Sequence, residues 1–450
     1  MKKVITYGTF DLFHEGHYRL LKRAKALGDY LIVGVTSESY DQSRGKLNVQ
    51  ESLAQRIEHV RNSGFADEII VEEYEGQKIH DIQKYKVDIF AIGSDWKGKF
   101  DYLKEYCDVV YLERTKNISS TQLRDRQFGV VRLGVAGNGR IANRFIPESK
   151  FVSGVNVEGV FGRNEAKLAA FVERHNLAFY SLDYDAFLDK VDAVYIATSH
   201  PTHYDFAKRA LASGKHVLCE KPLALSAEQA SELYELAGNM GCVLLEAIKT
   251  AFCPGFNRLV GVARSGRIGQ IRDVEATFTK LVSGNIRELD PDEAGGSVTE
   301  LASYPLLAIV KILGTKWNAV TWDAWFDPER GVDLFAKMHI AYDRAVGTAK
   351  TGLGVKSEGD LVIAGTAGYI YVPAPWWKTE YFEIRFENGN ENEKHFCKFD
   401  GDGLRYELAE FVSMIRKREL RSYKLIPEES IAIAGLIGRF RSGIGVRKFG

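Results

Sequence analysis

Two histidines stand three positions apart near the start of the chain, where a short apolar run gives way to helical spacing. Gly16 lies between His14 and His17, and residues i and i+3 share one face of a helix. The amino end of a helix carries positive potential, so a helix that starts here would hold a phosphate and neutralise the charge that builds on it. The alternative is that both histidines belong to a turn and have no chemical role.

A glycine-rich turn over residues 137–142 follows another apolar run. The spacing Gly-x-Gly-x-x-Ala after a strand and before a helix is typical of a dinucleotide pyrophosphate site. The next expected strand, 155–161, ends in Gly162-Arg163-Asn164. Folds specific for NAD usually place an acidic residue there, whereas an Arg would accept a 2′-phosphate, which favours NADP. The alternative is that Arg163 is a solvated loop residue and NAD is the cofactor.

An alternation of strands and helices would position the histidine pair. Apolar runs in the first third of the chain are continuous, and helix-like stretches separate them. Such runs indicate a parallel sheet that is covered on both faces. The expected strands are 4–7, 30–35, 68–71, 87–92 and 109–112, with a helix over 17–27.

The strand–helix pattern restarts at Phe128 and continues to about Leu245, after which the texture changes. Later segments alternate in hydrophobicity and predict a mostly antiparallel sheet. We therefore predict an α/β protein with two Rossmann-like domains, 1–127 and 128–250, and a C-terminal α+β domain, 251–450. The late strands are expected at 271–281, 334–342, 361–372 and 381–386, with helices over 305–313 and 403–417.

The composition excludes several classes of protein. A chain of 450 residues is long enough for about three domains. Its 60 basic and 60 acidic residues balance, which argues against a nucleic-acid partner. The five cysteines are scattered, so neither a disulfide framework nor a metal site of the protein is expected. No run approaches the ~20 apolar residues of a membrane span and no signal peptide is apparent, so we predict a cytoplasmic protein.

Residues 1–126 resemble the cytidylyltransferase family, and glycerol-3-phosphate cytidylyltransferases in particular. The resemblance rests on residues 7–17, 27–31 and 93–101, and on Arg114 to Thr121, which matches the family's R-T-x-x-I-S-[ST]-T signature. It implies transfer of CMP from CTP to an alditol phosphate, with Mg²⁺ accompanying the CTP phosphates.

The same resemblance assigns roles to single residues. His14 and His17 would stabilise the α-phosphate, and Lys46 would reach phosphate groups. The other residues implied at the CTP site are Thr9, Phe10, Asp95, Arg114, Thr115, Ser119 and Thr121. Two departures leave the acceptor open: the loop around Lys46 holds fewer lysines than the family does, and residues 62–64 lack an expected basic residue.

From Phe128 to its C-terminus the chain resembles the glucose–fructose oxidoreductase/inositol dehydrogenase (Gfo/Idh/MocA) family. Residues 136–142, 196–203 and 214–224 carry the resemblance, and Glu220-Lys221-Pro222 is its most specific part. It implies that Lys221 lies by the nicotinamide and orients a carbonyl or moves a proton. The implied cofactor-binding residues are Gly137, Gly139, Arg140, Ile141, Arg163, Thr198, His203 and Glu220.

The chain departs from that family in its next signature, over residues 294–304, where Glu300 replaces the usual Asp and Tyr304 replaces the commoner His. Tyr304 would donate a proton if Lys221 lowered its pKa, and Glu300 would contact the substrate. Lys249, in a second departing segment, is a candidate ligand for a substrate phosphate. Trp376-Trp377 is expected in sheet packing or in the interface of a homodimer or tetramer, more than in sugar stacking.

Together these features predict a bifunctional enzyme that makes a CDP-activated polyol. One half would reduce a small (phospho)sugar carbonyl with NAD(P)H, and the other would transfer CMP to an alditol phosphate such as glycerol 3-phosphate. By resemblance, such products, CDP-glycerol among them, feed teichoic-acid-like polymers or capsules. Two alternatives stay open: the oxidoreductase acts on a CDP-linked or unrelated sugar, or the C-terminal half binds a cofactor without catalysis.

Overall fold

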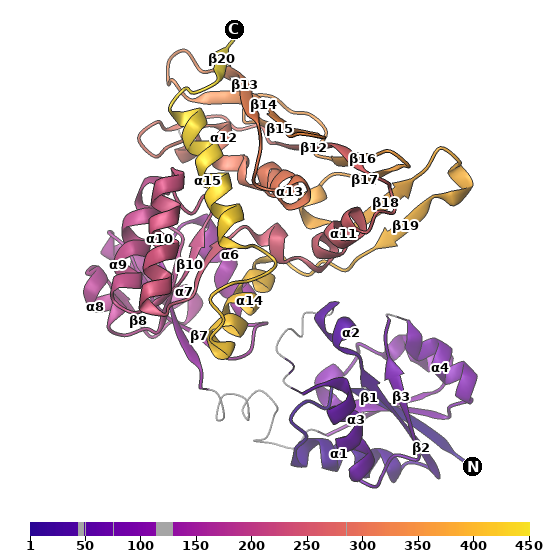
Figure 1. Cartoon of the computed structure of the whole chain (residues 1–450). Coiled ribbons are helices and arrows are strands. Elements are labelled where there is room, and N and C mark those ends of the chain that lie inside the picture. The colour runs from indigo at the N-terminus through magenta and orange to yellow at the C-terminus, as the bar shows by residue number, and fades with distance from the viewer. Residues whose placement is uncertain (44–48, 50, 75, 114–128, 285) are drawn as a thin grey trace. The chain divides into compact units, whose positions relative to one another are not determined.

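The computed structural model describes residues 1–43, 49, 51–74, 76–113, 129–284 and 286–450. The chain divides into two compact units, Met1–Val130 and Val131–Gly450, whose elements are labelled in Figure 1. The further division of the second unit near residue 250 stays a prediction, because residues 131–450 form one compact unit.

The first unit is a five-stranded parallel sheet in the order β3-β2-β1-β4-β5. Its strands are β1 (Lys3–Gly8), β2 (Tyr30–Thr36), β3 (Glu68–Glu72), β4 (Ile89–Gly93) and β5 (Asp108–Leu112). Its described helices are α1 (Glu15–Lys25), α2 (Glu38–Ser43), α3 (Leu53–Asn62) and α4 (Gln77–Tyr85), with the 3-10 turns η1 (Ser94–Trp96) and η2 (Asp101–Glu105).

The continuous apolar strands of this sheet bury side chains on both faces, as expected for a covered parallel sheet. Alternate residues of β1 divide between two cores: Val4 faces α1 and α3, whereas Ile5 faces α4 and η2. The predicted parallel sheet is therefore confirmed, and its carboxyl ends, after Gly8 and Thr36, meet at one edge.

The second unit begins with a six-stranded parallel sheet in the order β11-β10-β9-β6-β7-β8. Its strands are β6 (Val131–Ala136), β7 (Val155–Phe161), β8 (Phe179–Ser181), β9 (Ala193–Ile196), β10 (His216–Glu220) and β11 (Leu244–Ala247). The helices between them are α6 (Arg140–Ser149), α7 (Glu165–His175), α8 (Tyr184–Leu188), α9 (His203–Ala212) and α10 (Ala227–Met240), and η3 (His200–Thr202) precedes α9.

The rest of the second unit is built on a nine-stranded sheet, mostly antiparallel, in the order β19-β18-β17-β16-β12-β15-β14-β13-β20. Only the β12–β15 and β13–β20 pairs are parallel among its described strands. The strands are β12 (Ile271–Thr279), β13 (Ala319–Phe326), β14 (Asp333–Ala341), β15 (Val346–Gly352), β16 (Leu361–Gly365), β17 (Tyr369–Val372), β18 (Tyr381–Arg385), β19 (Glu393–Phe396) and β20 (Val446–Lys448).

Helices join this sheet to the parallel one. The remaining helices are α11 (Pro254–Arg264), α12 (Ser297–Leu301), α13 (Ser303–Leu313), α14 (Leu404–Lys417) and α15 (Pro427–Arg441), with the 3-10 turns η4 (Lys249–Phe252), η5 (Arg287–Leu289), η6 (Trp376–Lys378) and η7 (Gly389–Glu391). Helix α13 packs on β12 and β15, and α15 packs on both α13 and α10. In Figure 1, α15 runs between α10 and the large sheet, so it ties the two sheets of this unit together.

One strand that the sequence predicted is two strands in the structure. Residues 361–372 form the hairpin β16–β17, and the amide of Gly365 donates to the carbonyl of Gly368 across the turn at 2.9 Å. A Cβ on Gly368 would lie 2.7 Å from the carbonyl oxygen of Arg385, so a glycine is needed there. The buried residues change phase at the turn, from Leu361 and Ile363 in β16 to Ile370 and Val372 in β17, so the turn divides the predicted strand.

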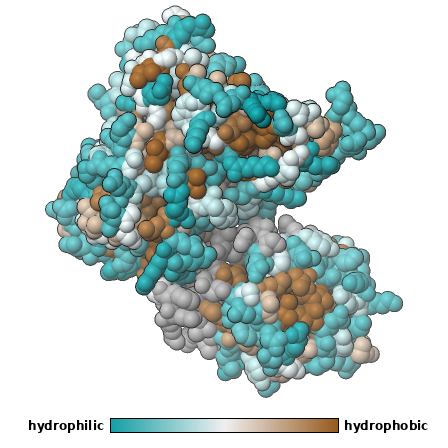
Figure 2. Space-filling view, viewed as in Figure 1, coloured by the Kyte–Doolittle hydropathy of each residue, from teal (hydrophilic) through white to brown (hydrophobic). Residues whose placement is uncertain are grey.

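Hydrophilic residues cover most of the face seen in Figure 2, and hydrophobic residues gather there in separate patches. Among the residues that the structure describes, none of the helices is long and apolar enough to cross a membrane.

Candidate active sites

The histidine pair lies at the carboxyl edge of the first sheet. Helix α1 starts at Glu15, two residues before the start that we predicted; His14 is its N-cap residue, and its Nδ1 accepts the amide of Gly16 at 3.0 Å. The rings of His14 and His17 stack with centroids 3.9 Å apart. Burial lowers the pKa of His14, so at neutral pH its Nδ1 is an acceptor and its Nε2 carries the proton. The pair thus presents a hydrogen-bond donor beside the amino end of α1.

The turn before α1 is held in a strained conformation. Phe10 and Leu12 have positive φ, 55° and 47°, which costs a residue with a side chain about 1–3 kcal/mol. The amide of Leu12 donates to the Glu51 carboxylate at 2.9 Å, and the amide of Glu51 donates to the Asp11 carboxylate at 3.0 Å. The predicted Phe10 side chain is 1% exposed and touches the ring of His17, so it supports the pair from behind.

Arg56 is the residue of this site that sequence reasoning missed. It is fully buried, and its NH1 donates to the carbonyl oxygens of Thr9 and Thr36 at 2.8 Å each. Asp41 lies 3.5 Å from that guanidinium and accepts the Thr9 hydroxyl at 2.9 Å. Sequence analysis did not predict α3; Arg56 lies four residues before the buried Val60 on that helix, and a buried arginine needs a partner.

Two buried groups lie beside the same edge. Lys78 on α4 is 6% exposed, pairs with the Glu72 carboxylate and lies 4.6 Å from the ring centroid of Tyr7. The hydroxyl of Thr36 donates to the same carboxylate at 3.2 Å. Lys78 and Glu72 thus form a buried ion pair beside this edge, which no sequence motif predicted.

Several predicted CTP residues lie outside the described residues. They are Lys46, Arg114, Thr115, Ser119 and Thr121, and the side chain of Asp95 is also not described.

The departure at residues 62–64 lies on the opposite edge of the sheet. Ser63 caps the end of α3, and the chain then enters β3 beside the start of β2, where the amide of Asp67 donates to the carbonyl of Leu31. This is the amino edge, whereas His14 stands at the carboxyl edge. Within its own unit, the missing basic residue is therefore not next to the histidine pair.

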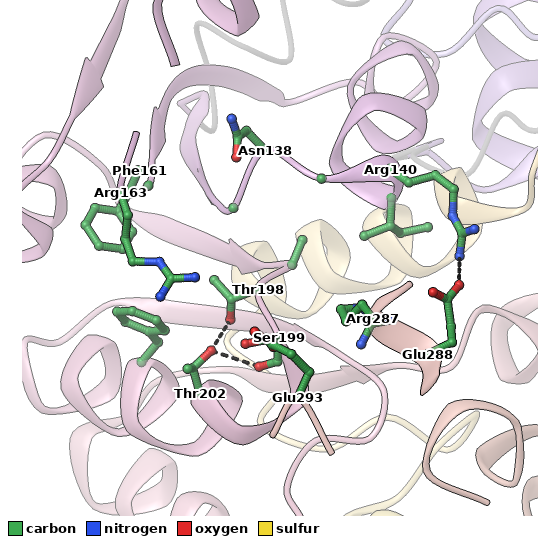
Figure 3. A pocket seen from close by; sticks show the side chains of 16 residues that line it. Asn138, Arg140, Phe161, Arg163, Thr198, Ser199, Thr202, Arg287, Glu288 and Glu293 are labelled. Carbon is green, nitrogen blue, oxygen red and sulfur yellow. Dashed lines mark hydrogen bonds and ion pairs between the residues drawn. The ribbon is translucent and has the colours of Figure 1, made fainter. Parts of the chain in front are cut away.

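The second unit contains a cavity of about 650 Å³ at the carboxyl ends of β6, β7 and β9 (Figure 3). It is lined by six of the predicted cofactor residues and by a segment of the C-terminal part that covers one side. The lining residues are Gly137, Asn138, Gly139, Arg140, Ile141, Phe161, Gly162, Arg163, Ala197, Thr198, Ser199, Thr202, Phe206, Arg287, Glu288 and Glu293.

The two glycines of the turn after β6 have different physical roles. Gly137 has φ 103°, and a Cβ there would lie 2.5 Å from the carbonyl oxygen of Ala197. Around Gly139, the N-cap of α6, a Cβ would meet nothing within 4 Å, and the first amides of α6 have no side-chain cap. Open space at an uncapped helix start is what a pyrophosphate needs. The turn therefore fits a dinucleotide.

Charge on the cavity wall is arranged around Arg163 and Glu288. The Arg163 side chain extends from the end of β7 into the cavity (Figure 3). Across it, Arg140 donates to Glu288 at 3.1 Å, and Lys280 binds the same carboxylate oxygen at 3.2 Å. Thr198 accepts a hydrogen bond from the Thr202 hydroxyl at 2.8 Å, which fixes the β9 end of the wall.

Lys221 lies in the turn after β10, and its Lys221–Pro222 peptide bond is cis. Its ammonium donates to the carbonyl of Glu300 at 2.9 Å. Two predicted cofactor residues, Glu220 and His203, are buried and do not line the cavity: Glu220 accepts the Tyr195 hydroxyl at 2.5 Å, and the Nδ1 of His203 lies 2.9 Å from the Pro222 carbonyl. Both therefore brace the Lys221 turn.

Tyr304 does not show the lowered pKa that the sequence led us to expect. Lys221 lies 6.0 Å from its ring centroid, but burial and then the nearby Glu220 raise the tyrosine pKa well above its ordinary value. The reason is that removal of the phenol from water disfavours its charged form. Tyr304 is therefore held protonated, which keeps it a hydrogen-bond donor.

The Glu300 carboxylate is paired with neighbouring side chains. Its carboxylate pairs with Arg287 at 2.8 Å and lies 3.7 Å from the ring of His200. Burial lowers the pKa of His200 well below its ordinary value and that of His203 to about 4, so both imidazoles are neutral at pH 7. Lys221 and Arg287 are thus the cations nearest to Glu300.

Lys249 and the tryptophan pair have structural contacts. The Lys249 ammonium donates to the Asp402 carbonyl at 2.7 Å, and burial lowers its pKa. Trp376 is fully buried, and its indole N–H donates to the Thr277 carbonyl at 2.9 Å. Trp377 stacks on Phe278 with centroids 3.8 Å apart.

Comparison with known families divides the chain at the same place as the two compact units of the structure. Residues 5–126 match the family described as "Cytidylyltransferase-like". Residues 131–247 match "Oxidoreductase family, NAD-binding Rossmann fold", and residues 256–371 match "GFO/IDH/MocA C-terminal domain".

Individual relatives match the same two parts of the chain. A glycerol-3-phosphate cytidylyltransferase of Bacillus spizizenii is 54% identical over 124 residues, 28% of this chain and 95% of that protein. scyllo-Inositol 2-dehydrogenase (NADP(+)) IolU of Bacillus subtilis is 27% identical over 327 residues, 70% of this chain and 98% of that protein. The structure of KijD10, a 3-ketoreductase from Actinomadura kijaniata in complex with NADP and TDP-benzene, shares the fold with a TM-score of 0.65 and 23% identity, covering 71% of this chain and all of that one (100%).

These matches cover the two units in turn and agree with the two sites. The chain therefore belongs to the cytidylyltransferase-like family over residues 5–126 and to the Gfo/Idh/MocA oxidoreductase family over the rest, and it is a nucleotidyltransferase fused to an oxidoreductase.

Proposed function

We propose that this enzyme makes a CDP-activated polyol in two steps on one chain. The second unit reduces the carbonyl of a (phospho)sugar, and the first unit transfers CMP from CTP to the resulting alditol phosphate, releasing pyrophosphate. The observation that carries the proposal is the presence of both sites on one chain, the first in a unit that is 54% identical to a glycerol-3-phosphate cytidylyltransferase.

In CMP transfer the alditol phosphate oxygen attacks the α-phosphate of CTP, and the bond to the β,γ-pyrophosphate breaks. The Nε2–H of His14 and the ring of His17 at the start of α1 would stabilise the charge that develops on the α-phosphate. Mg²⁺ would enter with CTP and neutralise its outer phosphates. Lys46, Arg114, Ser119 and Thr121 remain proposed phosphate ligands.

In the reductase unit, a bound NADPH supplies the hydride. The amides at the start of α6 would hold its pyrophosphate, and Arg163 would bind the 2′-phosphate. The ammonium of Lys221 would orient the substrate carbonyl, and the protonated phenol of Tyr304 would donate the proton. We favour NADPH over NADH because no acidic residue follows β7 at residues 162–164.

The direct test is a coupled assay on the purified chain. The chain is incubated with CTP, Mg²⁺ and each of a panel of alditol phosphates (glycerol, erythritol, ribitol and arabinitol). Pyrophosphate release measures CMP transfer. The alcohol that supports turnover is then offered with NADP⁺ as a reductant. The proposal predicts that one alditol phosphate serves both assays; cytidylyl transfer to an alcohol that the second unit never oxidises would contradict the shared pathway.

A second candidate is an oxidoreductase that acts on a nucleotide-linked sugar. It is favoured by KijD10, whose structure was solved with NADP and TDP-benzene, although that likeness at 23% identity concerns the fold. Offering CDP-alditol and free alditol phosphate separately with NADP⁺ distinguishes the two candidates. Binding of NADPH without turnover of any carbonyl would instead indicate a cofactor-binding unit without catalysis. The oligomeric state, proposed as dimer or tetramer, is read from the same preparation by light scattering.

A further inference from the structure

The turn that carries Lys221 is anchored at three consecutive residues. The Lys221 ammonium donates to the Glu300 carbonyl at 2.9 Å, the Pro222 carbonyl faces the Nδ1 of His203 at 2.9 Å, and the Leu223 amide donates to the Glu246 carboxylate at 2.9 Å. The partners come from three different elements, α12, α9 and β11. Such anchoring fixes both the backbone of the turn and the end of its lysine side chain.

Glu246 is an unusual group for this place. It stands on β11 opposite Cys219 of β10, and it is completely buried (0% exposed). A carboxyl group that is buried without a compensating role costs several kcal/mol, so an apolar residue would serve better if only packing were needed. Of the two oxygens, Oε1 accepts the Leu223 amide.

The groups around Glu246 come from β10, α10 and α15. They are Glu220 and Lys221 at the end of β10, Cys219 within it, Tyr234 on α10 and Ser430 on α15. Lys221 is the one cation among these named groups. Glu246 is thus connected through its Leu223 contact to the residue that is expected to act on the substrate.

We propose that Glu246 is a positioning residue for Lys221, which acts by holding the Leu223 amide. Glu246 is not one of the residues that line the cavity. Its effect passes through the turn: loss of the acceptor leaves the buried Leu223 amide without its partner, and the turn shifts to find another. A displacement of about 1 Å at a group that orients a reacting atom costs on the order of 100-fold in rate.

The test compares Glu246→Leu with Glu246→Gln in the full chain. The Leu variant keeps the volume roughly but removes the acceptor, whereas the amide oxygen of Gln still accepts the Leu223 N–H. The matched control is Glu148→Leu, which removes another buried carboxylate of the same unit, one that pairs with Arg405 instead. For each variant, kcat and KM of carbonyl reduction, NADPH affinity by fluorescence and CMP transfer are measured.

We expect Glu246→Leu to lower kcat of reduction on the order of 100-fold, with NADPH affinity and CMP transfer unchanged, and Glu246→Gln to restore most of kcat. Unchanged kcat in Glu246→Leu would overturn the proposal. So would equal losses in Glu246→Leu and Glu246→Gln, or an equal loss in Glu148→Leu, since each would indicate a structural effect without positioning.

This inference rests on the role proposed for Lys221, so a readout without turnover separates the two. The rate at which an amine-specific reagent labels Lys221, read by mass spectrometry, reports how firmly the ammonium is held. Faster labelling in Glu246→Leu but not in Glu246→Gln supports positioning even if no substrate is turned over. If the wild-type chain reduces no carbonyl, the proposed function fails; if labelling is the same in all variants, the positioning role fails.

Discussion

At the scale of single residues, the histidine pair makes the sharpest prediction for the first unit. Replacing His17 by Ala removes one of the two stacked imidazoles at the start of α1. We expect CMP transfer to fall by about 10²–10³-fold, the usual cost of one charge-stabilising donor. Pyrophosphate release measures it, and NADPH oxidation by the same chain checks integrity. Glu15→Ala is the neighbouring control, and a similar fall there would contradict a specific role for His17.

Arg56 predicts a stability effect. Arg56→Met leaves two buried carbonyl oxygens, on Thr9 and Thr36, without their donor and removes a cation from beside Asp41. Breaking such a buried arrangement costs about 3–5 kcal/mol. Urea denaturation measures the free energy of unfolding. Arg61→Met, which removes only an exposed pair with Glu58, serves as the control and should leave that free energy unchanged.

The role proposed for Arg163 predicts an effect on the choice of cofactor. Arg163→Ala should weaken NADPH binding by about 10–100-fold and leave NADH binding unchanged, because a charge-assisted contact to the 2′-phosphate contributes about 1.5–3 kcal/mol. Fluorescence titration with both cofactors measures this. Lys167→Ala, an exposed cation on the first turn of α7, controls for general loss of charge. Equal weakening of both cofactors would argue against 2′-phosphate recognition.

Sequence analysis identified the residues within motifs and missed the buried residues that fix the backbone around those motifs. Spacing pointed to the two histidines, the turn glycines and Arg163, and the family resemblance pointed to Lys221. Arg56 and Glu246 bind backbone groups far away in sequence, so no local pattern reveals their partners. The Tyr304 pKa could not be predicted either, because it depends on how deeply the fold buries the phenol.

At the scale of elements, helix α12 depends on a buried carboxyl. The side chain of Asp333 on β14 accepts the Ser297 hydroxyl at 2.6 Å and the Val298 amide at 2.9 Å, and so caps the helix that carries Glu300. Burial raises the pKa of Asp333 to about 7. Because the folded-state pKa lies above the unfolded one of 3.8, the contribution to stability is complete below pH 3.8 and is lost as pH rises through 7.

Asp333→Asn tests whether this carboxyl group makes the protein less stable as the pH rises. The Asn side chain keeps an acceptor oxygen for α12 and cannot ionise, so its melting temperature relative to wild type should rise by a few degrees between pH 5 and pH 8. Differential scanning fluorimetry across this range measures it. Asp327→Asn, at the exposed turn before β14, is the control, and a difference independent of pH would contradict the buried-acid account.

Strands and helices in regular alternation were predictable because their apolar periods are local. The parallel sheets, the change to a mostly antiparallel sheet and the helix over 404–417 follow from those periods. The sequence did not separate β16 from β17, and it did not announce the short β20 or its parallel pairing with β13. Pairings of that kind are fixed by contacts between distant segments, which a periodic pattern does not encode.

At the scale of the whole molecule, the two compact units predict two ligand-specific unfolding transitions. A ligand at 100 times its Kd stabilises the unit that binds it by about 2.7 kcal/mol. CTP with Mg²⁺ should therefore raise one calorimetric transition and NADPH the other, with His17→Ala abolishing neither transition. A single transition that both ligands raise equally would contradict independent units.

The position of α15 has a consequence for the order in which the chain matures on the ribosome. Residues 1–130 contain all strands of the first sheet, whereas the second unit needs α15 (Pro427–Arg441) to join its two sheets. At roughly 5–20 residues per second, synthesis of the intervening 300 or so residues takes on the order of 15–60 s. The nucleotidyltransferase unit therefore has time to close before its fused partner can, and nonsense or frameshift truncations before α15 would release chains whose first unit is folded and whose second unit exposes the faces of α10 and α13.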